Sequence, residues 1–390
     1  MIIRHFLSWV RTAPASERAE ATRALARAFL ISDLTPEDRQ AAEGALLTLL
    51  DDPSPLVRQA MSDVFADRAD APAEIVRVLT SDQFAVAAPL LEHSPLLIDA
   101  DLVDIVATGD EAVQCAVARR IELPTTVAAA IAEVGCAQAC LDLIENPDAE
   151  IAPLSLDRIV ERFGHVATLR EAMLQRNGLP AATRLALAGK LSSALVQFVT
   201  SRDWLSAERA DRMAEEARER AAVDVAVCAD GRDITALVRH LRASKQLTPG
   251  LLLRSLLSGH VELLHEALVQ LTDMPSQRVA GLLHERGGAS LNALLTRAGF
   301  PPSMLTAFRS AIEAGQEVGF VDTAEAAIRL RRRMVERVLT ACEHDQGASE
   351  ALLTLLRRYA TESAREEARL YCDELVAEDA VLAFDRPLAA

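Results

Sequence analysis

The sequence predicts an all-α protein, and three observations support this fold class. Half of the residues are hydrophobic but only 4% are aromatic, and Ala and Leu, both strong helix formers, fill most apolar positions. Between turns the apolar residues recur with a helical period, as in Leu102, Val103, Ile105 and Val106. Strand-like alternation occurs at residues 223–227, where one short strand would have no evident partner.

A chain of 390 residues is too long for one ordinary compact core, so two or more domains or an extended repeat array are expected. We predict a HEAT-like α-solenoid followed by a second helical domain. The predicted parts are HEAT-like helical repeats at residues 1–200, a charged connector helix at 201–230, the second helical domain at 231–375 and an acidic, flexible tail at 376–390.

The first residues, MIIRHFLSWVRTAP, are predicted to form a helix that docks on the core. Arg4 and His5 interrupt the apolar run, and Arg11 ends it before the apolar region of a secretory signal peptide is complete. A helix lying on a membrane surface is the alternative. No run approaches the roughly 18 apolar residues of a spanning helix, so a cytoplasmic protein is expected.

An acidic turn residue precedes an apolar helix at four places, Asp52, Asp82, Asp110 and Asp148, at intervals of 30, 28 and 38 residues. A two-helix unit cannot bury its apolar face alone, so such units stack on one another. The pattern resembles HEAT-type repeats, and the Asp-Pro-x-x-x-Val-Arg form at residues 52–58 is the best match.

Four hydroxyl–proline pairs are predicted to begin helices. The hydroxyl can cap free N–H groups, and proline suits the first turn because its missing N–H costs nothing there. The pairs are Thr35-Pro36, Ser54-Pro55, Ser94-Pro95 and Thr248-Pro249.

The formal net charge of −16 opposes nucleic-acid binding, since that affinity comes largely from Lys and Arg that displace counterions. HEAT-like nucleic-acid binding would need a basic concave face despite this total.

The six cysteines are expected to be reduced, without disulfides. A metal could reach both Cys136 and Cys140, but their apolar neighbours favour buried thiols and no zinc.

Two charged segments stand out after residue 200. Residues 201–220 mix both signs of charge at helical spacing with few large apolar groups, which indicates an exposed or connecting helix. Residues 329–337, RLRRRMVER, form a basic segment. A solvated helix face is the favoured interpretation of Arg331, Arg332 and Arg333, and a site for phosphate or an acidic partner is the alternative.

The segment SGHVELLHE at residues 258–266 invites interpretation as a metal or acid–base site. Glu262 and His265 share a helix face at the spacing of di-metal carboxylate bundles, but the second copy that such sites require is missing. His260 and His265 lie roughly 140° apart on a helix and cannot chelate one ion. We therefore predict an amphipathic helix with Glu262, His265 and Glu266 on its polar face.

A phosphotransfer site is the other candidate. Residues 240–244, HLRAS, faintly resemble the helix around a phospho-accepting histidine, but the expected run of small residues is incomplete. A surface histidine at His240 is favoured. The sequence contains no glycine-rich nucleotide loop and no Gly-x-Ser-x-Gly elbow.

Leu-Leu-Ser-Gly-His at residues 256–260, Leu-Leu-His-Glu at 282–285 and Ala-Gly-Phe-Pro at 298–301 lie in one continuous stretch at 251–312. This stretch resembles a bacterial family of uncharacterised all-helical proteins with HEAT-like repeats. The resemblance implies helical architecture and a bacterial cytoplasmic setting. It implies no activity and assigns no functional residue.

We expect a non-enzymatic scaffold or adaptor that binds a protein or peptide in bacterial regulation, without a cofactor. The alternative is a helical enzyme or phosphotransfer protein in which His240, Glu262, His265 and His284 converge. The candidate partner-surface residues are Glu262, His265, Glu266, His240, Arg331, Arg332 and Arg333.

Overall fold

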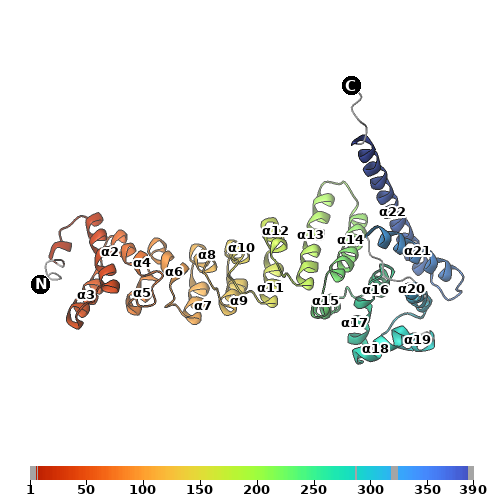
Figure 1. Ribbon diagram of the computed structural model, residues 1–390, viewed down its shortest axis with the longest axis horizontal. Coiled ribbons are helices and arrows are strands. Elements are labelled where there is room, and N and C mark those ends of the chain that lie inside the picture. Colours follow the sequence, from red (N-terminus) through yellow and green to blue (C-terminus); the bar gives the residue numbers. More distant parts are fainter. Residues whose placement is uncertain (1–5, 7, 286–287, 318–323, 385–390) are drawn as a thin grey trace, which may run out of the picture. The chain divides into compact units, whose positions relative to one another are not determined.

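The structure, a computed structural model, describes residue 6 and residues 8–285, 288–317 and 324–384. This part of the chain contains α-helices, one short 3-10 helix and no strand (Figure 1), which confirms the all-α prediction. The chain divides into two compact units, Met1–Leu179 (unit 1) and Pro180–Ala390 (unit 2). No helix within the described residues combines the length and the apolar character needed to cross a membrane.

Unit 1 consists of short helices joined by tight turns. Alternate helices pack on one another, so that α2, α4, α6, α8, α10 and α12 form one row, and α7, α9 and α11 follow one another in a second (Figure 1). This alternation is the arrangement expected of stacked two-helix units. The helices are α2 (Ala15–Ile31), α3 (Pro36–Leu49), α4 (Pro55–Phe65), α5 (Ala73–Leu79), α6 (Phe84–His93), α7 (Asp99–Thr108), α8 (Glu111–Ala118), α9 (Thr125–Val134), α10 (Ala137–Glu145), α11 (Pro153–Phe163) and α12 (Ala167–Gln175).

A ladder of buried or half-buried polar side chains ties each helix pair to the one before it. Arg120, Arg162, Arg176 and Asn146 donate hydrogen bonds of 2.6–3.3 Å to backbone carbonyl oxygens that lie 26–32 residues earlier. The acceptors lie at or just beyond the C-terminal ends of α6, α9, α10 and α8, where carbonyl groups lack partners within the helix. The ladder therefore satisfies helix ends and fixes the spacing between pairs.

The acidic turn residues also connect neighbouring helices. Asp52 accepts two hydrogen bonds of 2.8 Å from Arg18 on α2, and Asp82 pairs with Arg58 on α4. A helix begins within a few residues after each of the four predicted aspartates.

At the N-terminal end, Phe6 and Val10 pack half-buried against the core of unit 1, while residues 1–5 and 7 lie outside the described part.

Three of the four hydroxyl–proline pairs lie at helix starts, and the fourth does not. The hydroxyls of Thr35 and Thr248 accept hydrogen bonds from N–H groups in the first turn, and a helix also begins at Pro55. The prediction for Ser94-Pro95 is wrong, because α6 ends at His93 and α7 begins at Asp99. The carbonyl of Ser94 instead accepts a hydrogen bond from the buried Arg120 and belongs to the end of α6.

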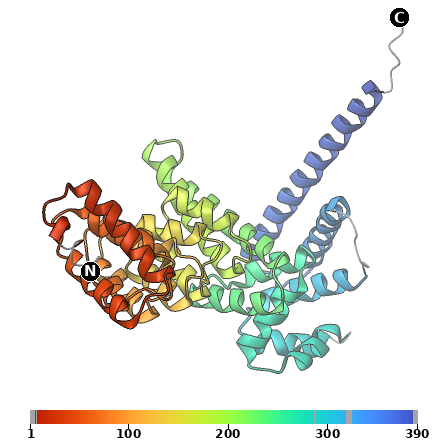
Figure 2. The same cartoon turned by 60° about the vertical axis from the view of Figure 1, so that its left-hand side comes forward.

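Unit 2 contains longer helices. These are α13 (Ala181–Ser201), α14 (Ala207–Val227), α15 (Gly231–Ala243), α16 (Pro249–Leu257), α17 (Val261–Thr272), α18 (Ser276–His284), α19 (Gly288–Arg297), the 3-10 helix η1 (Pro302–Met304), α20 (Leu305–Glu317), α21 (Ala324–Glu343) and α22 (Glu350–Phe384). Residues 223–227 lie in α14 and form no strand. The core gathers around α16, whose residues Leu251–Leu257 are all buried, and the C-terminal part of α22 extends beyond the helices that pack on its start (Figure 2).

The division between the units differs from the predicted boundary at residue 200. It lies between Leu179 and Pro180, because α13 runs across residue 200 and pairs along its length with α14. The predicted connector at residues 201–230 therefore mostly forms α14, whose Ala222, Val223 and Ala226 are buried. Of the predicted flexible tail, residues 376–384 form the end of α22, and residues 385–390 lie outside the described part.

Candidate functional site

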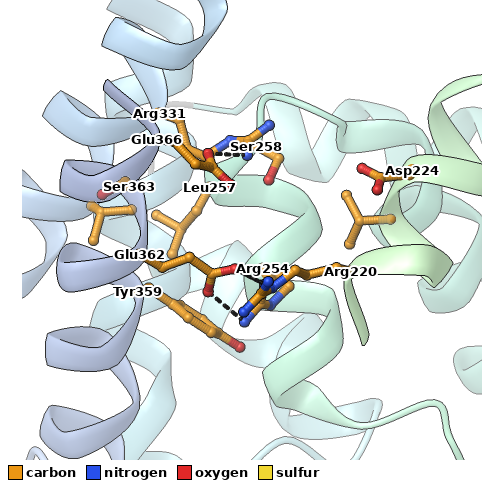
Figure 3. Close-up of a pocket in the computed structure, with 12 residues that line it drawn as sticks. Arg220, Asp224, Arg254, Leu257, Ser258, Arg331, Tyr359, Glu362, Ser363 and Glu366 are labelled. Carbon is orange, nitrogen blue, oxygen red and sulfur yellow. Dashed lines mark hydrogen bonds and ion pairs between the residues drawn. The ribbon is translucent and has the colours of Figure 1, made fainter. Parts of the chain in front are cut away.

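A small cavity of about 80 Å³ lies in unit 2 where α14, α16, α21 and α22 meet (Figure 3). Charged and hydroxyl side chains from all four helices reach it, together with three apolar side chains. The lining residues are Arg220, Val223, Asp224, Arg254, Leu257, Ser258, Arg331, Val335, Tyr359, Glu362, Ser363 and Glu366.

Arg254 is the centre of this cluster. It belongs to α16, where Leu251–Leu257 are all buried, and only 8% of the residue is exposed. Its terminal nitrogens donate to both carboxylate oxygens of Glu362 at 3.2 and 3.0 Å, and its guanidinium stacks 4.4 Å above the ring of Tyr359 (Figure 3). Burial is the largest single influence and acts to lower the pKa of Arg254, but the hydrogen bonds and charge of Glu362 together with the contacts to Tyr359 outweigh it, so the pKa is raised.

A second ring of charges surrounds this pair. Arg358 donates to Glu216 at 3.1 Å and to Glu219 at 3.4 Å, and Arg220 forms an ion pair with Glu362. Burial raises the pKa of Glu219 against the opposing pull of the Arg254 and Arg358 charges. The network thus links α14 and α16 to α22 through paired, partly desolvated charges.

A further Arg–Glu ion pair between two helices lies at the upper wall of the cavity. Arg331 of α21 donates to Glu366 of α22 at 2.9 Å (Figure 3). The cavity lining holds three arginines and three carboxylates, so its charges balance, and it includes neither His nor Cys. Ser363 donates to a carbonyl of its own helix. The ion pairs of this cluster join α16, α21 and α14 to α22.

The histidines proposed to converge have separate local partners. Nε2 of His265 lies 3.1 Å from the carbonyl oxygen of Ser276, and Nδ1 of His284 lies 2.8 Å from that of Ala280 on its own helix. His240 is half-buried on α15 and Glu262 is exposed on α17. Within the described residues, no group of three or more His, Cys, Asp or Glu side chains is arranged to hold a metal ion.

Part of the polar face of α17 contacts the neighbouring helix α15. Glu266 accepts a hydrogen bond of 2.9 Å from Gln270, which also donates to the carbonyl of Thr235 on α15. His265 and Glu266 are therefore half-buried, and Glu262 is the member of the predicted polar face that remains exposed.

The basic segment of α21 faces carboxylates of the same chain. Arg331 pairs with Glu366, Arg332 with Glu336 and Glu367, and Arg329 with Glu374, whereas Arg333 is exposed. The acidic partner considered for this segment is thus largely α22 itself.

Sequence reasoning missed Arg254, although a lone arginine within the apolar run LLLRSLL marks a buried charge that needs a partner.

The family model described as "Uncharacterised protein conserved in bacteria (DUF2336)" matches residues 86–346, more than half of the chain. The chain belongs to this family. Neither the curated proteins nor the solved structures include a match. The DUF2336 match contains Arg254 and Arg331 but ends before α22, so their partners Glu362 and Glu366 lie outside it.

The DUF2336 match begins within the most acidic part of the chain. Residues 51–150 contain nineteen Asp and Glu but five Arg and no Lys. The excess of acidic residues over basic ones in this segment accounts for most of the net charge of −16. Side chains such as Asp104, Glu111, Glu145 and Asp148 are exposed on the helices and turns of unit 1.

Internal contacts occupy most of the arginines of this segment. Arg120 is buried in the carbonyl ladder, and Arg58, Arg68 and Arg119 form ion pairs with carboxylates. Arg77 is exposed on α5. Arg18, Arg23 and Arg158 from outside the segment also pair with its carboxylates. The acidic side chains remain in excess, so this surface is negative.

Proposed function

We propose that this DUF2336 protein is a non-enzymatic helical-repeat scaffold or adaptor, and that unit 1 binds a protein or peptide partner carrying a basic surface. The supporting observation is the acidic excess of residues 51–150, whose arginines are mostly turned to internal contacts. A surface of one sign attracts a partner of opposite sign and speeds its association.

The alternating helix rows suit this role. Each added helix pair extends the surface, so a stack offers an extended interface without a deep pocket. The Arg–carbonyl ladder holds successive pairs at fixed spacing. A rigid surface loses little conformational entropy when a partner binds, which favours affinity.

The same charge argues against nucleic acid as the partner of unit 1, because phosphates would meet carboxylates there. A phosphotransfer role would depend on His240, which is half-buried on α15 beside Arg239. The balanced charges of the unit 2 cavity favour a structural role for that cluster over a catalytic one.

The test compares partner capture by the full-length chain and by a charge-neutralised variant. The variant carries Asp104→Asn, Glu111→Gln, Glu145→Gln and Asp148→Asn, all at exposed positions of unit 1. We expect the wild-type chain to retain one or a few basic proteins from native bacterial lysate, with retention that weakens as salt rises. The variant should lose most of this retention.

A matched control neutralises four exposed carboxylates of unit 2, Glu208→Gln, Asp211→Asn, Glu262→Gln and Glu285→Gln. It changes the net charge equally and should retain the partner. Equal loss in both variants would point to a non-specific charge effect and contradict a site on unit 1. Turnover of a small metabolite by the purified chain would contradict the non-enzymatic role.

A further inference from the structure

The helical pair α13–α14 carries an exposed apolar stripe in unit 2. Leu191, Leu195 and Phe198 follow one another at helical spacing on one side of α13, and Trp204 follows in the turn. These four residues are 43%, 54%, 44% and 61% exposed. We call them the α13 stripe.

The stripe lies on the half of the hairpin that is remote from the core of unit 2. At the other end, Leu185 and Val223 are buried in the core of unit 2. Residues 190–214 are all described, and Ala210 alone among them is buried. The turn between α13 and α14 lies away from α15 and α16 (Figure 1). Two helices bury only the faces that they share, so the outer apolar face needs a partner.

The end of the stripe is held in a fixed shape. The rings of Phe198 and Trp204 meet edge to face, with centroids 5.6 Å apart. The guanidinium of Arg202 lies 4.2 Å from the centroid of Phe198 and 5.4 Å from that of Trp204. The backbone N–H of Trp204 donates to the carbonyl of Val199 at 3.1 Å. A partner therefore meets a preorganised surface.

The charge distribution favours a second copy as that partner. Residues 191–201 contain no charged side chain, although the chain carries a net charge of −16. Two copies meeting through acidic unit 1 surfaces would repel each other, whereas they can meet here without opposing carboxylates on α13. A basic partner recruited by unit 1 would find no carboxylate on this side of α13.

The stripe supplies the apolar centre of a dimer interface. A whole aromatic side chain contributes about 150–250 Å², so four large side chains exposed by about half present several hundred Å² per copy. Together with the neighbouring small residue Ala194 this is about half of the ~800 Å² per partner of a standard interface, and further side chains of the α13–α14 pair would supply the rest. Small residues also allow close approach of two helices.

We propose that two copies of this chain dimerise through the α13 stripe. Their α13 helices cross antiparallel at a two-fold axis beside Leu195, and the two α13–α14 pairs form a four-helix bundle. In this register Leu191 of one copy faces Phe198 of the other. The inference is independent of the proposed function, because it uses a different surface.

The first test is sedimentation of the full-length chain at micromolar concentration. We expect a dimer for the wild type and a monomer for Leu195→Glu, which places two like charges beside the axis. Leu174→Glu on α12, at a position that is 58% exposed, is the matched control and should remain dimeric. Circular dichroism of each variant checks that the helices are intact.

The second test is cross-linking, which remains informative if the charged variant fails to fold. In a background with Cys228→Ser and Cys372→Ser, which removes the exposed thiols, Leu195→Cys should form a disulfide-linked dimer on mild oxidation. Ser193→Cys, on the opposite side of α13, should not. A monomeric wild type, a dimeric Leu195→Glu, or equal cross-linking at positions 193 and 195 would overturn the proposal.

Discussion

Arg120 donates a hydrogen bond of 2.6 Å to the carbonyl oxygen of Leu91, 29 residues earlier in the chain. The same guanidinium reaches the carbonyl of Ser94 at 2.7 Å, and burial lowers the pKa of Arg120. One side chain thereby closes the C-terminal end of α6 and joins two helix pairs of unit 1.

Replacing Arg120 by Met should destabilise unit 1 by about 2–4 kcal/mol, because several buried carbonyl oxygens lose their donor. Chemical denaturation followed by circular dichroism measures the change. Arg77→Met, at an exposed position on α5, is the control and should cost less than about 0.5 kcal/mol. Equal effects of the two substitutions would contradict a structural role for the ladder.

The Arg254–Glu362 pair gives a second prediction, for unit 2. Glu362→Leu alone leaves a buried guanidinium without its main partner and should cost roughly 3–5 kcal/mol. Arg254→Met combined with Glu362→Leu removes both charges and should recover most of that loss. A double-mutant cycle by urea denaturation measures the coupling, and additive effects would show that the pair does not act as a unit.

Much of the fold was open to prediction from sequence, because helix formation depends on local patterns. Ala- and Leu-rich runs with helical spacing predicted helices, and Thr35 and Thr248 cap helices as expected. The units divide between Leu179 and Pro180 and not near residue 200, because α13 crosses that position and packs against α14. Pairing between helices is a tertiary property that local periodicity does not contain.

The site residues were harder to predict for the same reason. Arg254 and Glu362 are 108 residues apart in sequence, so no short motif contains both. Fragments such as SGHVELLHE suggest a metal site by composition alone, whereas Nε2 of His265 lies 3.1 Å from the carbonyl oxygen of Ser276. The acidic surface of unit 1 was concealed in the total charge, which averages residues 51–150 with a nearly neutral remainder.

The exposed cysteines should react with alkylating reagents much faster than the buried ones. Burial raises the pKa of Cys115 and Cys140 to about 12 and that of Cys342 to about 11, whereas Cys228 and Cys372 are exposed. A thiol must ionise to react, so the three buried cysteines should resist alkylation at pH 8. Mass spectrometry after brief labelling should find Cys228 and Cys372 modified first. Early labelling of Cys140 in native protein would contradict this packing of α10.

The Arg58–Asp82 pair should make the stability of unit 1 depend on pH. The hydrogen bonds from Arg58 lower the pKa of Asp82 below its ordinary value of 3.8, and both side chains are 17% exposed. The unfolded chain therefore takes up a proton at higher pH than the folded one. The contribution of the pair is complete well above pH 3.8 and is lost as the pH falls through the lower folded pKa.

Asp82→Asn should accordingly cost about 1–2 kcal/mol at pH 7 and less at pH 3, because the loss begins below the unfolded pKa. The measurement follows Trp9 fluorescence during urea denaturation in a Trp204→Phe background, because the chain has two tryptophans and Trp9 then reports on unit 1 alone. Asp104→Asn, at an exposed position of α7, is the control. A stability difference for Asp82→Asn that is unchanged between pH 7 and pH 3 would show that ionisation of this carboxylate does not stabilise the joint between α4 and α6.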